Sequence, residues 1–173
     1  TTLGKMFGIF IASLIIYFLA GIRMNVLKIP FVTHEVNIGW WSFPITIFWI
    51  LALTNAVNLI DGLDGLADGV SMISLTTMGI VVYFFLLTHQ LYVSIACFML
   101  AACLLGFLPY NFHPAKIFLG DTGALYIGFM IAVLSLKGLK NVTFISLLVP
   151  IIILGVPITD TVYAMIRRKL NKK

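Results

Sequence analysis

Charged residues are scarce in this chain of 173 residues: they make up only 10%, against about 25% in an ordinary soluble domain. With 61% hydrophobic residues and a mean hydropathy of +1.12, this scarcity excludes a soluble globular fold. The alternating pattern of an outer-membrane barrel is also missing, because apolar runs of about 15 to 22 residues are continuous. We therefore expect an all-α fold, a polytopic bundle of transmembrane helices.

Cysteine is nearly absent as well. The two cysteines, Cys97 and Cys103, fall in one apolar run and are expected to pack as small side chains without forming a disulfide. Basic residues are scattered singly over most of the chain, which argues against nucleic acid binding. They crowd only into residues 167–173, and this basic tail predicts a cytoplasmic end.

Hydropathy predicts about six spans. They cover roughly residues 6–22, 44–60, 66–87, 90–108, 123–136 and 143–166. The segment 23–43 is too polar to cross and ends in Trp40-Trp41, an aromatic pair typical of an outer membrane interface. No signal-peptide layout precedes the first span. We expect residues 1–173 to form a single integral-membrane domain that is incomplete at both ends.

Aspartate is placed on one side of this predicted topology. Alternation of the spans puts the loops 61–65 and 109–122 on the cytoplasmic side with the basic tail. All five aspartates fall at cytoplasmic loop or helix-end positions, and only Glu35 lies outside. A carboxylate facing lipid at mid-bilayer would cost roughly 2.5–3.5 kcal/mol. The aspartates are therefore expected to converge on a polar cytoplasmic active site.

The densest motif is the segment 55–69, NAVNLIDGLDGLADG. Its aspartates share one narrow arc if the segment is helical. They are Asp61, Asp64 and Asp68. The glycines Gly62, Gly65 and Gly69 would allow a helix or a ligand to approach closely, and Asn55 and Asn58 add amide groups. A helix cap would explain one aspartate but not three.

A second motif is the segment 109–123, PYNFHPAKIFLGDTG. Asp121 can hold a divalent cation, while Asn111 and Lys116 offer a donor and a positive charge to phosphate oxygens. A helix cap is the alternative for Asp121. His113 is more typical of a solvated loop histidine than of a base.

The chemistry that suits these groups is magnesium-assisted phosphoryl transfer, in which the protein positions and neutralises phosphates. Phe118 could stack on a nucleobase, although an aromatic residue at such a position more often packs in a core or interface. A Walker-type loop is absent. The D-G-x-x-A-R pattern of phosphatidyl-alcohol transferases is absent too, because Gly65 and Leu66 stand where Ala-Arg should be.

At these two motifs the sequence resembles the polyprenyl-phosphate N-acetylhexosamine-1-phosphate transferases, in particular the undecaprenyl-phosphate N-acetylglucosamine-1-phosphate transferases. The resemblance covers nearly the whole chain. It implies that UDP-N-acetylglucosamine gives its sugar phosphate to undecaprenyl phosphate, releasing UMP, with Mg²⁺ at the site. The product would initiate a cell-envelope glycopolymer. The enzyme would lie in the lipid bilayer of the bacterial plasma membrane, with its active site facing the cytoplasm.

The resemblance also implies roles for single residues. Asp121 would bind the metal and, with Asp61 and Asp64, form the catalytic set. The substrate-binding residues would be Lys5, Asn58, Asn111, Lys116 and Phe118, the last stacking on uracil. The family's lysine motif K-L-x-G-Q is matched at Lys5, although Ile9 replaces its glutamine. Asp68 is left out of the site. The family's Asp-Asp pair is expected before Thr1 and its histidine cluster after Lys173.

Two other functions compete with this reading. One is the related phospho-N-acetylmuramoyl-pentapeptide transferase. The other is a cation transporter, which should carry its carboxylates near mid-membrane rather than at one face. The sequence does not decide between a monomer and a homodimer.

Overall fold

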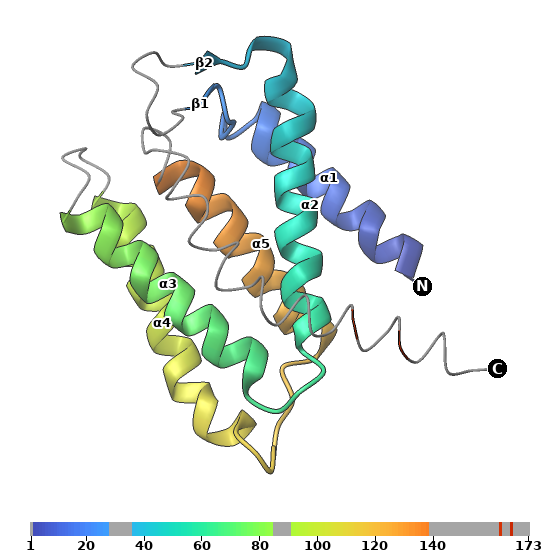
Figure 1. Cartoon of the computed structure of the whole chain (residues 1–173), viewed down its shortest axis with the longest axis vertical. Coiled ribbons are helices and arrows are strands. Elements are labelled where there is room, and N and C mark those ends of the chain that lie inside the picture. The colour runs from blue at the N-terminus through green and yellow to red at the C-terminus, as the bar shows by residue number, and fades with distance from the viewer. Residues whose placement is uncertain (1, 28–35, 85–90, 139–162, 164–166, 168–173) are drawn as a thin grey trace.

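The computed structural model describes residues 2–27, 36–84, 91–138, 163 and 167. Nearly all of their regular structure is helical (Figure 1). The helices are α1 (Thr2–Phe18), α2 (Ser42–Ile60), α3 (Leu66–Phe84), α4 (Leu91–Asn111) and α5 (Gly120–Gly138). The short strands β1 (Val26–Leu27) and β2 (Val36–Asn37) pair antiparallel, and a 3-10 turn, η1 (Gly39–Trp41), leads into α2. The predicted all-α bundle is confirmed.

The helices follow the predicted spans with shifted ends. Among the described residues, three helical stretches are long and apolar enough to cross a membrane: Gly39–Ile60, Leu66–Phe84 and Leu91–Asn111. Helix α1 stops at Phe18, before the end predicted at 22, and the connection that follows contains Gly21 with a φ of 61°. Helix α5 extends past both ends predicted for the fifth span. The sixth predicted span lies almost wholly outside the described residues, so a total of six spans stays a prediction.

Small residues allow the helices to pack closely. Helix α3 packs chiefly on α4, α2 on α5, and α1 on α2. A Cβ at Gly128 of α5 would lie only 2.8 Å from the Cα of Thr54 in α2. Between α3 and α4, a Cβ at Gly79 would lie 3.1 Å from the Phe98 ring. These contacts need glycine, as is usual where helices meet in membranes. Both cysteines are free: Cys97 is buried, as expected of a packing residue, whereas Cys103 is exposed.

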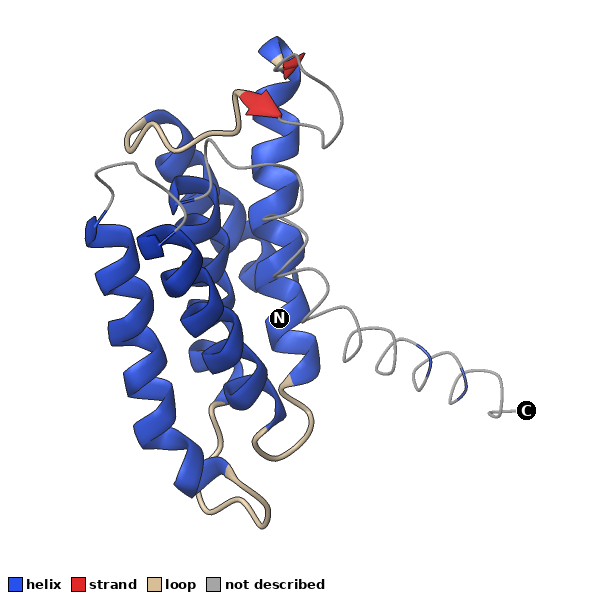
Figure 2. Ribbon diagram, turned by 60° about the vertical axis from the view of Figure 1, so that its left-hand side comes forward, coloured by secondary structure: helices blue, strands red, loops and turns tan. Residues whose placement is uncertain are grey.

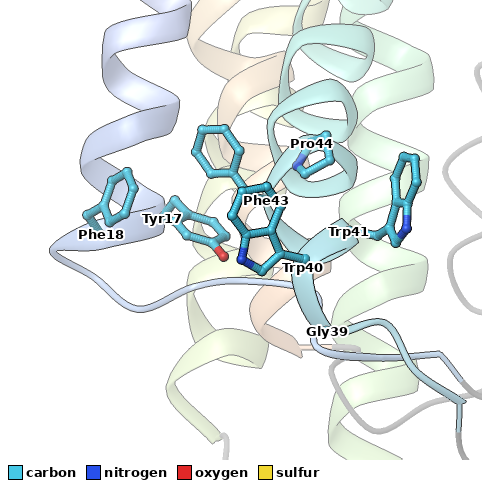
Figure 3. Close-up of a pocket in the computed structure, with 7 residues that line it drawn as sticks. All are labelled: Tyr17, Phe18, Gly39, Trp40, Trp41, Phe43 and Pro44. Carbon is cyan, nitrogen blue, oxygen red and sulfur yellow. The ribbon is translucent and has the colours of Figure 1, made fainter.

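An aromatic cluster lies where α1 ends and α2 begins (Figure 3). It borders a cavity of about 740 Å³. The lining residues are Tyr17, Phe18, Gly39, Trp40, Trp41, Phe43 and Pro44. The Arg23 guanidinium lies 6.0 Å from the centre of the Tyr17 ring. Aromatic rings beside a cation are typical of a membrane interface, which agrees with the sequence interpretation of Trp40-Trp41.

Asp68 is an unusual member of the core. It lies in the first turn of α3 and is fully buried, yet neither carboxylate oxygen has a hydrogen-bond partner among the described residues. The hydroxyls of Ser71 and Ser74 on the same helix are in the same situation. An acidic group in a first helical turn gains about 0.3–1 kcal/mol from the helix dipole. Desolvation of a buried carboxylate costs several kcal/mol, which is more than the helix dipole returns, so we expect Asp68 to destabilise the fold.

We predict that Asp68→Asn raises the Tm of the detergent-solubilised protein by a few degrees, because the amide keeps the shape and removes a charge that is costly to bury. Asp64→Asn is the matched comparison and should lower the Tm, because a neutral amide oxygen accepts the bonds from His113 and Ala115 more weakly than the charged carboxylate does. A thermal melt of both variants beside the parent protein measures this. A lower Tm for Asp68→Asn would mean that Asp68 has a stabilising partner.

Candidate active site

Two connections lie at the same end of the bundle (Figure 2). They are the turn 61–65 between α2 and α3 and the loop 112–119 between α4 and α5. Both motifs singled out in the sequence therefore meet at one end, as the alternation of spans predicts. The polar groups found there come from four helices and both connections.

Asp121 is the residue on which the helices converge. It lies in the first turn of α5, just after Gly120, whose φ of 68° requires glycine. The Lys5 ammonium of α1 pairs with Oδ2 of Asp121. The Asn58 amide of α2 donates to Oδ1 at 3.1 Å. The carboxylate is thus bound by two other helices, and it accepts no bond from its own helix, which argues against the helix-cap alternative.

Asp61 lies next to this group, as the C-cap residue that directly follows α2. Partial burial raises the pKa of its carboxyl, and the negative charge of Asp121 raises the pKa further. Asp61 therefore accepts a proton, or a nearby cation, more readily than an ordinary surface aspartate.

Asp64 connects the two loops. Its Oδ2 accepts a hydrogen bond from the backbone N–H of Ala115 at 3.1 Å and lies 3.0 Å from Nδ1 of His113. The Ala115 bond, followed by the His113 bond, lowers the pKa of the Asp64 carboxyl. Asp64 is therefore held as a carboxylate, with one oxygen occupied by the protein.

Asn111 makes a second connection between the loops. This last residue of α4 is only 3% exposed. Its Oδ1 accepts from the backbone N–H of Gly65 at 3.0 Å, and its Nδ2 donates to the carbonyl of Ile117 at 3.0 Å. Gly65 has a φ of 71°, and a Cβ there would lie 3.4 Å from the Phe112 ring. The turn at Gly65 therefore fits only glycine comfortably.

The predicted site residues divide into two groups. Lys5, Asn58 and Asp121 are in direct contact, and Asp61 lies near them. Asp64 and Asn111 bind the neighbouring loop rather than Asp121. Lys116 and Phe118 are exposed on that loop, Phe118 by 71%. The Lys116 ammonium makes none of the hydrogen bonds found in the described part of the chain. The catalytic, metal and substrate roles assigned to these residues remain predictions.

One local expectation for the first motif was wrong. The aspartates do not share a helical arc, because α2 ends at Ile60 and α3 starts at Leu66, with the left-handed Gly65 between them. Of the three glycines, Gly65 has a close neighbour in Phe112, whereas a Cβ at Gly62 or Gly69 would meet nothing within 4 Å, so the close approach of a ligand to these two stays a prediction.

Asn55 is also turned away from the site. Its amide donates to the Leu51 carbonyl of its own helix at 2.7 Å. Conversely, sequence reasoning gave His113 little weight, although it contacts Asp64. Its place in a short loop between two motif residues was the one available signal.

Several known proteins are similar to this chain over most of its length. The chain is 51% identical over 154 residues to the probable undecaprenyl-phosphate N-acetylglucosaminyl 1-phosphate transferase of Bacillus subtilis (strain 168), covering 88% of this chain and 42% of that protein. It is 44% identical over 110 residues to the phospho-N-acetylmuramoyl-pentapeptide-transferase of Listeria innocua, covering 64% and 33%. The protein of that name from Clostridium botulinum (strain Eklund 17B / Type B) is 42% identical over 139 residues, covering 80% and 40%.

The chain thus spans less than half the length of these curated relatives. The model of the family described as "Glycosyl transferase family 4" matches residues 1–139, which include α1 to α5 and both connections at the acidic end of the bundle. Because this model matches most of the chain, the chain belongs to glycosyl transferase family 4.

Proposed function

We propose that the protein to which this chain belongs transfers N-acetylglucosamine 1-phosphate from UDP-N-acetylglucosamine to undecaprenyl phosphate and releases UMP. The observation that carries the proposal is the contact of Lys5 and Asn58 with Asp121. It gathers a cation, an amide donor and an exposed carboxylate at one end of an apolar bundle, where a water-soluble nucleotide and a membrane lipid can meet. The name of the 51% identical relative supports the same reaction.

The residues around Asp121 are compatible with Mg²⁺. The described residues contain no group of three or more His, Cys, Asp or Glu side chains that could hold a metal by themselves. Mg²⁺ rarely needs such a cage, since it commonly binds one or two carboxylates plus substrate phosphates and water. Asp121, 58% exposed and with Asp61 near it, offers that donor set. The chemistry that a bound Mg²⁺ supplies is neutralisation of the diphosphate charge.

The chain's own residues would position the reacting groups. Asn58 holds one oxygen of Asp121 and so fixes the orientation of the carboxylate. Lys5 is 41% exposed, and its ammonium can leave Asp121 to bind a phosphate oxygen. Holding both phosphates in one place lowers the barrier to transfer, because the reaction becomes effectively unimolecular.

The second group of residues suits the nucleotide half of the donor. The hydrogen bonds from His113 and Ala115 both go to Oδ2 of Asp64, which leaves Oδ1 to accept from a ligand. The ring of Phe118 is exposed on the adjoining loop. A flat apolar ring and an acceptor oxygen are the features that bind a nucleobase. The buried Asn111 amide would act by holding this loop in place.

The alternative donor is UDP-N-acetylmuramoyl-pentapeptide, which the names of the 42–44% identical relatives favour. We expect the full-length protein in membranes to release UMP from UDP-N-acetylglucosamine with a kcat/KM at least about tenfold higher than from the muramoyl-pentapeptide donor. A UMP-release assay with undecaprenyl phosphate as acceptor measures both. The reverse preference would favour the alternative, and no release from either donor would refute a phosphosugar transferase.

Asp121→Asn should reduce magnesium-dependent transfer by at least about 100-fold, because the amide cannot replace the negative ligand. The variant should keep its stability to within about 1 kcal/mol, since an exposed site carboxylate adds little to packing. Lys137→Gln is the control: it removes a charge at the other end of α5, where Lys137 lies over the Tyr92 ring. UMP release across a magnesium titration distinguishes the two. Near-normal activity of Asp121→Asn would exclude a metal role.

The proposed location is the bacterial plasma membrane, with the acidic end of the bundle facing the cytoplasm. We predict that Gly62→Cys, in a cysteine-free background of the full-length protein, reacts with a membrane-impermeant thiol reagent only from the cytoplasmic side. Trp40→Cys should react only from the opposite side. Both positions are exposed, so accessibility does not limit labelling. Labelling of both from one side would contradict the proposed topology.

A further inference from the structure

His113 is the one imidazole in the described part of the chain that contacts a carboxylate of the site. Its Nδ1 lies 3.0 Å from Oδ2 of Asp64, although its own side chain is 82% exposed. An exposed pair of this kind contributes little to folding, with a median of about 0–1 kcal/mol. Stability alone therefore gives a weak reason for the contact.

The geometry around Asp64 gives a better reason. Because Oδ2 is acceptor-only in the carboxylate form, Nδ1 of His113 must carry the hydrogen that it shares with Asp64. The Ala115 N–H approaches the same oxygen at 3.1 Å. Two donors on one oxygen fix the plane of the carboxylate more firmly than one donor does. Oδ1 is then left pointing away from both donors, as an acceptor with a defined direction.

We propose that His113 is a positioning residue for nucleotide binding: with the Ala115 amide it orients Asp64 so that Oδ1 accepts a hydrogen bond from the nucleotide half of the donor substrate. The inference rests on the proposed function and adds to it a residue that does not itself touch the substrate. It assigns no proton transfer to His113, whose ring is mostly in solvent.

This role predicts which substrate is affected. Asp64 and His113 belong to the two connections and not to the Lys5–Asn58–Asp121 contact. Loss of His113 should therefore weaken nucleotide binding and leave the positions of the phosphate groups unchanged. One hydrogen bond of ordinary strength corresponds to an affinity change of about five- to tenfold.

The test uses the full-length enzyme and three variants. His113→Ala should raise the KM for UDP-N-acetylglucosamine about five- to tenfold, while kcat and the KM for undecaprenyl phosphate change less than about twofold. His113→Asn should restore the nucleotide KM, because its amide nitrogen can take the place of Nδ1. His113→Gln should not, because its amide sits near the position of Nε2. Calorimetric binding of UMP should follow the same order.

A double-mutant cycle makes the test specific. In an Asp64→Ala background, His113→Ala should have no further effect on UMP affinity, because the carboxylate that His113 contacts is no longer there. Tyr110→Phe is the control, since Tyr110 is 54% exposed on the neighbouring segment and its hydroxyl takes part in no hydrogen bond found among the described residues.

The outcomes separate this inference from the proposed function. If the parent enzyme releases UMP and His113→Ala has an unchanged nucleotide KM, the positioning role is wrong and the function stands. Equal losses for nucleotide and lipid, or additive effects in the double-mutant cycle, would also overturn it. If the parent enzyme releases no UMP while UMP binding still follows the predicted order, the transferase fails and the positioning role stands.

Discussion

The close contact of α5 with α2 at Gly128 is the constraint on which the acidic end of the bundle depends. Any side chain at Gly128 would collide with the backbone of Thr54, so the spacing of these helices is set there. At about 1.5 Å per residue, Asp121 lies some 10 Å along α5 from Gly128, and Asp61 lies a similar distance along α2 from Thr54. The two antiparallel helices therefore present their carboxylates at one level, within reach of Asn58.

That placement creates an electrostatic imbalance. Asp61 is partly desolvated and faces the charge of Asp121, and both effects disfavour a second negative charge. Lys5 offsets one of the two charges. Because the pKa of Asp61 is raised, its ionisation as pH rises works against the folded arrangement, and a cation bound nearby would relieve that cost. An attraction for cations thus follows from the packing of two helices, before any substrate is considered.

The sequence predicted α2, α3 and α4 well because a lipid-facing helix carries its signal in its own residues, as a continuous apolar run. It also predicted which loops meet, because alternation of spans fixes their side. It did not predict side-chain partners. Asn55 and Asn58 are chemically identical and one turn apart, yet one bonds its own helix and the other bonds Asp121. Because Gly65 adopts a left-handed conformation, the chain turns between Asp61 and Asp68 and does not continue as the helix that the aspartate spacing suggested.

The two groups of site residues differ in how strongly hydrogen bonds and ion pairs hold them in place. This difference suits the proposed transferase. Four hydrogen bonds made by the side chains of Asp64 and Asn111 join the two connections, and the Asn111 side chain is nearly buried. Such bonds contribute about 1 kcal/mol each and keep this side of the candidate site preformed. The Lys5–Asp121 pair is exposed, and pairs of this kind contribute only about 0.2–1 kcal/mol. Phosphate oxygens and a cation can therefore displace it at little cost. If the proposed function is right, the donor would bind first by its base to the rigid side and then separate Lys5 from Asp121 as its diphosphate enters.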